Sequence, residues 1–317
     1  MEFVRTPDDR FDKLVGYPFE PRYVELGSGL RMHCVDEGPR RGRPVLLLHG
    51  QPTWSYLYRS VIPTLSAAGY RAIAPDMVGF GRSDKPTART AYSVGNHIGW
   101  LTELLDAIGL DDLVVVAQDW GGPIGLGALA AAPHRFAAVV ATNTILHTAD
   151  ASLAGKLTWA CHATSEGRVE VESVLLDYQR ITQELTPFRP SLFVGGATSS
   201  DVAPAVLAAY DAPFPDERFC AGARQLPTLM GLTPGSECAR INRRTSATLA
   251  GFSKPFLTAY SDEDPSTRGW ERVLRDLVPG AAGQPHAVIG GAGHFLQEDA
   301  GPALARVIVD FLARSGL

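Results

Sequence analysis

A carboxylate stands at the centre of the tight turn predicted for residues 118–122 (QDWGG). The continuous apolar run Leu113–Ala117 precedes this turn, and a helical pattern over Pro123–Ala132 follows it. A strand, a sharp turn with small flanking residues and then a helix form the layout of a nucleophile elbow. Asp tolerates the positive φ of such a turn better than most residues do. The pattern therefore favours Asp119 as a nucleophile over a helix cap or an ordinary ion-pair partner.

A carboxylate nucleophile has different chemistry from a serine hydroxyl. It is already an anion at pH 7, so it needs no base before it attacks. The N-terminal end of the following helix favours its ionised form further. Such a group can displace a leaving group from saturated carbon and form an alkyl ester. Hydrolysis of that ester then requires an activated water and a site for the oxyanion.

A histidine that could activate this water follows the last predicted strand. His294 comes directly after the glycine-rich residues 290–293 (GGAG), and a loop past a strand end can reach the catalytic edge of the sheet. We therefore predict that His294 is the general base. The other histidines lack this context and are interpreted as packing, surface or loop-supporting residues: His33, His49, His97, His134, His147, His162 and His286.

The carboxylate that orients this base should come from another strand end. The predicted strand Pro255–Tyr260 runs into residues 261–265 (SDEDP). Asp264 is the preferred residue because it directly precedes Pro265, where the backbone is held extended. Asp262 is the alternative.

The chain order of these three residues supports the assignment. The strand ending at Ala141 is followed by residues 142–144 (TNT), which contain no carboxylate. The order is then Asp119, Asp264, His294, which is the nucleophile, acid, base order of α/β-hydrolases.

The oxyanion needs two N–H donors beside the nucleophile. One candidate is the backbone N–H of Trp120, directly after Asp119. The other is the backbone N–H of Gln51, just after the predicted first strand, Val45–Leu48.

Strands and helices alternate on both sides of a less regular middle segment. Apolar runs without polar alternation suit strands that are covered on both faces. A helix is also predicted between Ser93 as its N-cap and Gly109 as its stop. The remaining predicted elements are strands Arg71–Ala74, Ala137–Ala141 and Ala287–Ile289, and helices Gly269–Leu277 and Ala303–Leu312. This alternation predicts an α/β-hydrolase fold, with a mostly parallel central sheet flanked by helices.

The middle segment has a different composition. Pro, Ser and Gly become more frequent, and strands are hard to find. Two helical patterns, Val169–Glu184 and Ala203–Tyr210, are separated by Pro187, Pro190, Pro213 and Pro215. We predict a helical cap at residues 145–243, inserted into a core formed by residues 1–144 and 244–317.

The composition excludes several other classes of function. The net charge is −5 without a basic cluster, so nucleic acid is not expected as a partner. No apolar run approaches the roughly 18 residues of a membrane span, and the acidic N-terminus has no signal-peptide pattern. Four scattered cysteines contain no C-x-x-C pair. These features favour a cytoplasmic protein with reduced thiols and no membrane association.

The combination of residues 51–59 (QPTWSYLYR) with residues 118–122 (QDWGG) resembles the haloalkane dehalogenases. The similarity is to the subfamily whose catalytic acid follows the penultimate strand. It extends over nearly the whole chain and is weakest over residues 150–201. Further matching stretches are residues 5–8 (RTPD), 17–19 (YPF), 79–86 (GFGRSDKP), 210–216 (YDAPFPD) and 292–295 (AGHF).

This resemblance implies a halide site. The indole N–H of Trp120 would bind the departing halide, since it donates and does not accept. The subfamily also has a second halide-binding tryptophan in the cap. Here Tyr178 aligns with that position, and Trp159 is an alternative donor that more readily fits a packing role. Gln51 stands where the family usually has Glu or Asn, and still offers its backbone N–H.

The resemblance implies hydrolysis of small halogenated organic substrates to an alcohol, a halide ion and a proton. No cofactor or metal is implied, and the chain is expected to be a monomer or a small homo-oligomer. Two alternatives remain open. An epoxide hydrolase would use Tyr178 and Tyr210 as donors to the epoxide oxygen, whereas a divergent relative would act on a specialised metabolite or only bind ligand.

Overall fold

The computed structural model describes residues 1–149, 160–163, 169–172 and 174–317. Its centre is an eight-stranded sheet in the order β12-β11-β8-β7-β4-β5-β3-β2, of which the first six strands run parallel. The predicted α/β-hydrolase fold and all six predicted strands are confirmed. The parallel strands are β4 (Pro44–Leu48), β5 (Arg71–Pro75), β7 (Leu113–Asp119), β8 (Phe136–Thr144), β11 (Phe256–Ser261) and β12 (Ala287–Ile289).

Two antiparallel strands complete one edge of the sheet and were not predicted. They are β2 (Arg22–Glu25) and β3 (Arg31–Glu37). Their sequences carry charged residues at both ends and lack the long apolar runs of the parallel strands. A second, two-stranded pairing joins β1 (Phe3–Val4) to β6 (Lys85–Pro86).

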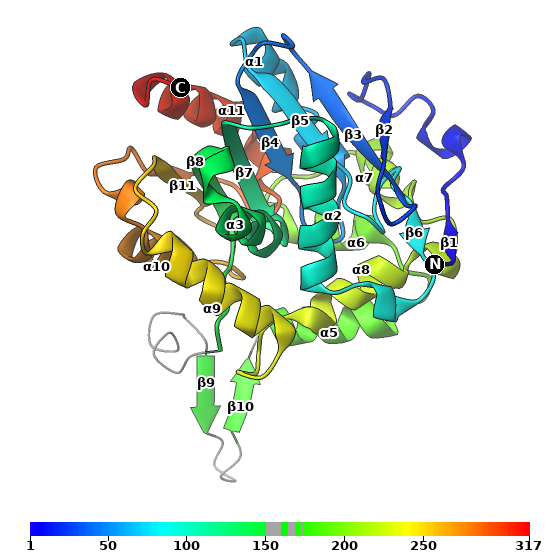
Figure 1. Cartoon of the computed structure of the whole chain (residues 1–317). Coiled ribbons are helices and arrows are strands. Elements are labelled where there is room, and N and C mark those ends of the chain that lie inside the picture. The colour runs from blue at the N-terminus through cyan, green and yellow to red at the C-terminus, as the bar shows by residue number, and fades with distance from the viewer. Residues whose placement is uncertain (150–159, 164–168, 173) are drawn as a thin grey trace.

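Helices cover both faces of the sheet. On one side α2 (Val94–Ala107), α3 (Gly121–Ala131) and α9 (Glu237–Leu249) pack together in front of the strands in Figure 1. The predicted N-cap of α2 is confirmed, because the Ser93 side chain accepts a hydrogen bond from the N–H of Asn96. The other helices on the core are α1 (Ile62–Ala67), which packs against α11 (Leu296–Arg314), and α10 (Trp270–Leu277), which packs against β11.

A mainly helical insertion separates β8 from α9, as predicted. Its helices gather at one end of the sheet, and a β-hairpin projects beside them (Figure 1). The hairpin consists of β9 (Ala160–Ala163) and β10 (Val169–Glu172), and the helices are α5 (Val174–Glu184), α6 (Pro190–Ala197), α7 (Pro204–Asp211) and α8 (Ala221–Gln225). We refer to these elements as the insertion.

Two expectations for the insertion were wrong. The predicted helix Val169–Glu184 begins only at Val174, because residues 169–172 (VEVE) alternate at the strand period and pair with β9. Pro190 does not interrupt structure but starts α6, since proline is favoured in the first turn of a helix. The division into core and cap stays a prediction. Its boundary between residues 243 and 244 falls within the continuous helix α9.

The core lies between the sheet and its helices. The apolar residues of β4 and β7 are completely shielded from solvent over Val45–Leu47 and Leu113–Ala117. Full burial of such side chains contributes about 1.5–3 kcal/mol each. The strand ends that follow are therefore held on a rigid platform. Among the described residues, no helix has the length and apolar character required to cross a membrane.

Candidate active site

Asp119 is the last residue of β7 and has the positive φ of +49° expected of an elbow. The small residues after it are required by close packing. A Cβ at Gly121 would lie 2.4 Å from the carbonyl oxygen of Leu48, and one at Gly122 would lie 1.8 Å from Oγ1 of Thr144. Strand and helix can therefore meet at this turn only because both positions are glycine.

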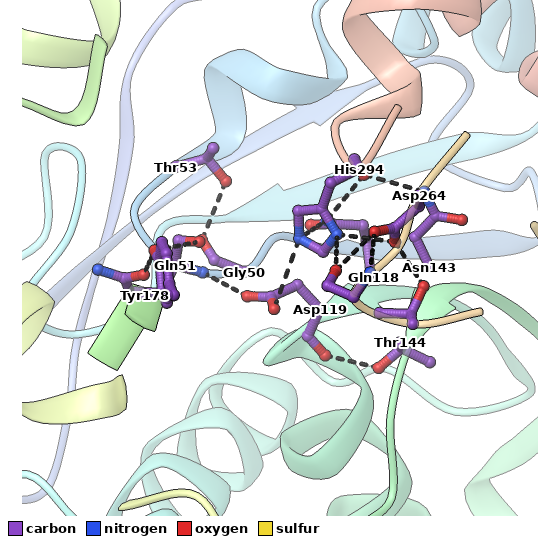
Figure 2. Close-up of polar contacts among 12 residues, drawn as sticks. Gly50, Gln51, Thr53, Gln118, Asp119, Asn143, Thr144, Tyr178, Asp264 and His294 are labelled. Atoms are coloured by element: carbon purple, nitrogen blue, oxygen red, sulfur yellow. Dashed lines mark hydrogen bonds and ion pairs between the residues drawn. The ribbon is translucent and has the colours of Figure 1, made fainter. Parts of the chain in front are cut away.

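The Asp119 carboxylate is held at one oxygen and faces the histidine with the other (Figure 2). Oδ1 accepts a hydrogen bond from the backbone N–H of Gln51 at 2.8 Å, and Oδ2 lies 3.6 Å from Nε2 of His294. A Cβ at Gly50 would come within 2.1 Å of Oδ1, so only glycine permits this approach. Within the part of the chain that the structure describes, Asp119 forms no ion pair with an arginine. Its orientation is the one that a nucleophile requires.

Asp264 is the carboxylate that contacts the imidazole. Its Oδ2 lies 2.9 Å from Nδ1 of His294, and the Asp264 side chain is almost completely buried. The alternative, Asp262, instead accepts the N–H of Ala292 near the surface. Burial by itself would raise the pKa of Asp264, but the charge and hydrogen bond of His294 outweigh it and hold this pKa well below its ordinary value. Asp264 therefore stays ionised and fixes the proton of His294 on Nδ1.

His294 lies between two carboxylates. Its burial disfavours the imidazolium form, but the charges of Asp264 and Asp119 prevail and raise the pKa of His294 to about 10. With Nδ1 facing Asp264, the lone pair of the neutral ring is on Nε2 and faces Asp119. A water between Nε2 and an ester of Asp119 would be within reach of this base.

Two supporting residues were not recognised from the sequence. Ser266 donates to Oδ1 of Asp264 through its N–H at 2.8 Å and its hydroxyl at 2.6 Å. Asn143 donates through Nδ2 to the carbonyl oxygen of His294 at 3.0 Å. A hydroxyl two residues after an aspartate is a local pattern that indicates such a turn, so Ser266 could have been found. The contact of Asn143 spans 151 residues and has no local pattern.

Gln51 connects the nucleophile to the insertion. Its side-chain Nε2 donates to the carbonyl oxygen of Ala223 on α8 at 2.8 Å, and its Oε1 accepts the hydroxyl proton of Tyr178 on α5. The Tyr178 ring also packs edge-on against Phe193, with ring centroids 5.2 Å apart. Burial raises the pKa of Tyr178 well above its ordinary value, and the charge of Asp119 adds to this effect. Tyr178 thus lies at the site, but its proton is directed to Gln51.

The other predicted donors differ in their environment. Trp120 is buried at the start of α3, and its indole N–H donates to none of the described residues. Trp159 lies outside the described residues. Tyr210, the second tyrosine that an epoxide hydrolase would need, donates to Glu298 on α11 instead. Among the described residues, no group of three His, Cys, Asp or Glu side chains is arranged to hold a metal ion.

Comparison with known proteins places this geometry in context. Residues 43–300 match the family model of the α/β hydrolase fold. The chain is 44% identical over 316 residues to a haloalkane dehalogenase of Psychrobacter cryohalolentis, covering 98% of each chain. It is 42% identical to a haloalkane dehalogenase of Mycobacterium marinum, over 98% of this chain and 100% of the other. A solved tetrameric haloalkane dehalogenase of Paraglaciecola agarilytica is similar with a TM-score of 0.84 and 29% identity, covering 99% of this chain and 98% of that one.

Proposed function

This chain belongs to the haloalkane dehalogenases, hydrolases of the α/β-hydrolase fold, and we propose that it opens the carbon–halogen bond with Asp119 as a covalent nucleophile. The observation that carries the proposal is that the two oxygens of the Asp119 carboxylate have different partners. Oδ1 is fixed by the N–H of Gln51, whereas Oδ2 accepts no backbone N–H of the described residues and faces His294. Asp119 displaces the halide from carbon, and an alkyl ester and a halide ion result.

The second step returns the carboxylate. His294 takes a proton from water through Nε2, and the resulting hydroxide attacks the ester carbon of Asp119. The Gln51 N–H stabilises the oxyanion on Oδ1, and the N–H of Trp120 is the second proposed donor. The tetrahedral intermediate then collapses: the bond between the ester carbon and the alkoxy oxygen breaks, and the alkoxide takes a proton from His294 and leaves as the alcohol. The new carboxyl group of Asp119 releases a proton, which restores the carboxylate.

Loss of the negative charge of Asp119 on esterification lowers the pKa of His294, which allows His294 to act as a base in the second step. In the free enzyme the Asp119 anion is one of the groups that raise the pKa of His294. Esterification removes that charge, so the pKa of His294 falls in the alkyl-enzyme. The imidazole becomes a neutral acceptor only when there is an ester to hydrolyse.

Trp120 is the proposed halide donor, because its buried indole N–H donates to none of the described residues. Tyr178 is the proposed second donor in place of the subfamily's tryptophan. Its hydroxyl would have to leave Gln51 to reach a halide. Trp120 is the stronger candidate for the halide donor. Its indole N–H gives up no hydrogen bond to a described residue when it binds a halide, whereas the Tyr178 hydroxyl must exchange one hydrogen bond for another.

Substrates are small halogenated organic molecules, and we further propose a cytoplasmic enzyme that needs no cofactor or metal. Its oligomeric state is proposed to be monomeric or a small homo-oligomer. The Paraglaciecola relative is described as tetrameric. The core and cap boundaries predicted from the sequence remain part of this proposal.

Trapping the alkyl-enzyme tests the mechanism. Wild-type protein and His294→Gln are mixed with 1-bromobutane, quenched and analysed by intact-protein mass spectrometry. His294→Gln should accumulate an adduct of one butyl group on Asp119 and release one bromide per site, because only the second step needs the base. Continued bromide release without any added mass would exclude the covalent scheme. Styrene oxide in a parallel assay separates the epoxide hydrolase alternative, for which diol formation is expected.

A further inference from the structure

A buried glutamine contacts the catalytic nitrogen of the base. Nε2 of Gln118 lies 3.2 Å from Nε2 of His294 and 3.4 Å from the carbonyl oxygen of the same residue. Gln118 is completely shielded from solvent, and its Oε1 has no hydrogen-bond partner among the described residues. Leaving a buried oxygen without a hydrogen bond is unfavourable, so its position beside the base calls for a reason.

The neighbouring strand supplies a second unpartnered group. Gln118 and Thr142 are paired Cα partners in the parallel register of β7 and β8, so their side chains lie on the same face of the sheet. Thr142 is also fully buried, and its hydroxyl has no partner within the described part of the chain. A hydroxyl both donates and accepts, so it can serve either end of an adjacent amide.

We propose that Gln118, supported by Thr142, is a positioning residue that holds His294 in both of its protonation states by rotating its side-chain amide. This inference rests on the proposed role of His294. In the alkyl-enzyme, where the imidazole is neutral, Nδ1–H donates to Asp264, and an N–H of Gln118 occupies the Nε2 lone pair until the attacking water replaces it.

When the imidazole has taken a proton from water, the amide turns and Oε1 accepts the new Nε2–H. The amide nitrogen then faces the Thr142 hydroxyl. The carbonyl oxygen of His294 keeps its donor through this rotation, because Asn143 also donates to it at 3.0 Å. The Thr142 hydroxyl, which has no partner among the described residues before the rotation, can then accept an N–H of the amide.

The proposal predicts which catalytic step depends on Gln118. Alkylation uses the Asp119 carboxylate and the halide donors without His294, whereas hydrolysis requires a correctly oriented His294. Gln118→Met keeps the length and removes both hydrogen-bonding groups, so it should slow hydrolysis about tenfold while alkylation stays near the wild-type rate. The butyl-enzyme should then accumulate with 1-bromobutane. Thr142→Val should accumulate less butyl-enzyme than Gln118→Met does. Thr142→Ser keeps a hydroxyl and should behave like the wild type.

The pH profile gives a readout that a purely structural role would not move. The charged groups that act on His294 are Asp264, from the loop after β11, and Asp119, from β7. Gln118→Glu adds a third negative charge, which stabilises the imidazolium. The pH limb for hydrolysis of the butyl-enzyme should therefore move to higher pH by about one unit.

The experiment combines quench-flow mass spectrometry with bromide detection from pH 5 to 10. Gln297→Met is the matched control, because Gln297 is also buried, but its amide lies beside Tyr58 and not beside His294. It should leave the ratio of the two rates unchanged. An unshifted pH limb in Gln118→Glu, or equal losses of alkylation and hydrolysis in Gln118→Met, would overturn the proposal. If His294→Gln forms no adduct, the covalent scheme itself fails; an adduct in His294→Gln but none in Gln118→Met overturns only the role of Gln118.

Discussion

The catalytic edge of the sheet and the insertion both help to position Asp119, the proposed nucleophile, but they do so by different means. At the sheet edge, buried strands and glycine contacts fix the backbone of Asp119, and the angle of its side chain follows from the positive φ. Among the described residues, the insertion reaches the same carboxylate through Gln51, whose side chain accepts a hydrogen bond from the Tyr178 hydroxyl and donates one to the carbonyl oxygen of Ala223. The position of Asp119 is thus set by rigid backbone. The side chains of the insertion can be substituted with a smaller loss of stability than the residues that hold this backbone.

Hydrogen bonds also join the insertion to the loop that carries His294. The N–H of His294 donates to the carbonyl oxygen of Ala197 at the end of α6, at 2.8 Å. Asp299 accepts the N–H groups of Gly293, Ser199 and Ser200. The insertion therefore helps to position the loop of His294, although it contains none of the three residues of the proposed triad.

The largest expected effect is at the sheet edge. Asp119→Ala removes the nucleophile, so turnover of 1-bromobutane should fall by at least about 10⁴-fold and no butyl adduct should form. The melting temperature should stay within a few degrees, because Asp119 forms no arginine ion pair in the described structure. Bromide release and circular dichroism measure the two quantities. Turnover within tenfold of wild type would mean that the carboxylate is not the nucleophile.

Asp264→Asn should have the next largest effect. An amide cannot fix the Nδ1–H tautomer as a carboxylate does, so the hydrolysis rate should fall by about 10²–10⁴-fold. Asp262→Asn is the matched control and should change the rate by less than a few-fold, because Asp262 does not contact His294. Single-turnover kinetics distinguish the two variants. Equal losses in both would return Asp262 to consideration as the orienting acid.

The same pair predicts a pH dependence of stability. The pKa of Asp264 is lowered by folding, so its contribution is present above the unfolded value of about 4 and is lost as the pH falls. The pKa of His294 is raised to about 10, so its contribution is complete below about 6.5 and is lost as the pH rises through 10. The difference in unfolding free energy between wild type and Asp264→Asn should be largest between about pH 4 and 6.5. Urea titrations at several pH values measure this difference.

The comparison of the two regions also explains which features could be predicted from the sequence. Asp119 ends a strand, Asp264 and His294 follow strands, and each of the three lies within two residues of Gly or Pro, so local patterns identify them. Strands covered on both faces carry long apolar runs, which is why all six parallel strands were found. The short strand β2 has charged residues at both ends and no long apolar run. It is stabilised by its pairing with β3, which the local sequence does not indicate.

The insertion was less predictable because its structure depends on distant partners. The hydroxyl of Tyr178 bonds to Gln51, 127 residues away, and no local pattern encodes that contact. Residues 169–172 fit a helix or a strand, and pairing with β9 decided between them. Tertiary packing overrides weak local preference in such segments.

Tyr210→Phe tests how firmly the insertion is attached. Tyr210 on α7 donates to Glu298 on α11, and Glu298 also pairs with Arg59 through two hydrogen bonds. Loss of a buried hydrogen bond to a charged group should lower the unfolding free energy by about 1.5–3 kcal/mol. Tyr23→Phe removes an exposed hydroxyl contact and should change it by less than about 0.5 kcal/mol. Equal melting temperatures in both variants would mean that this contact does not fasten the insertion.

The smallest expected effect is at the boundary between the regions. Tyr178→Phe removes the hydroxyl that Gln51 accepts, yet Gln51 keeps its bond to Ala223 and its N–H on Asp119. Bromide affinity, measured by quenching of tryptophan fluorescence, should therefore change by only a few-fold. Trp120→Phe removes an indole N–H that donates to none of the described residues, and it should weaken bromide binding by about tenfold or more. If the two substitutions weaken binding equally, the Tyr178 hydroxyl leaves Gln51 to bind the halide, and the insertion takes a direct part in the chemistry.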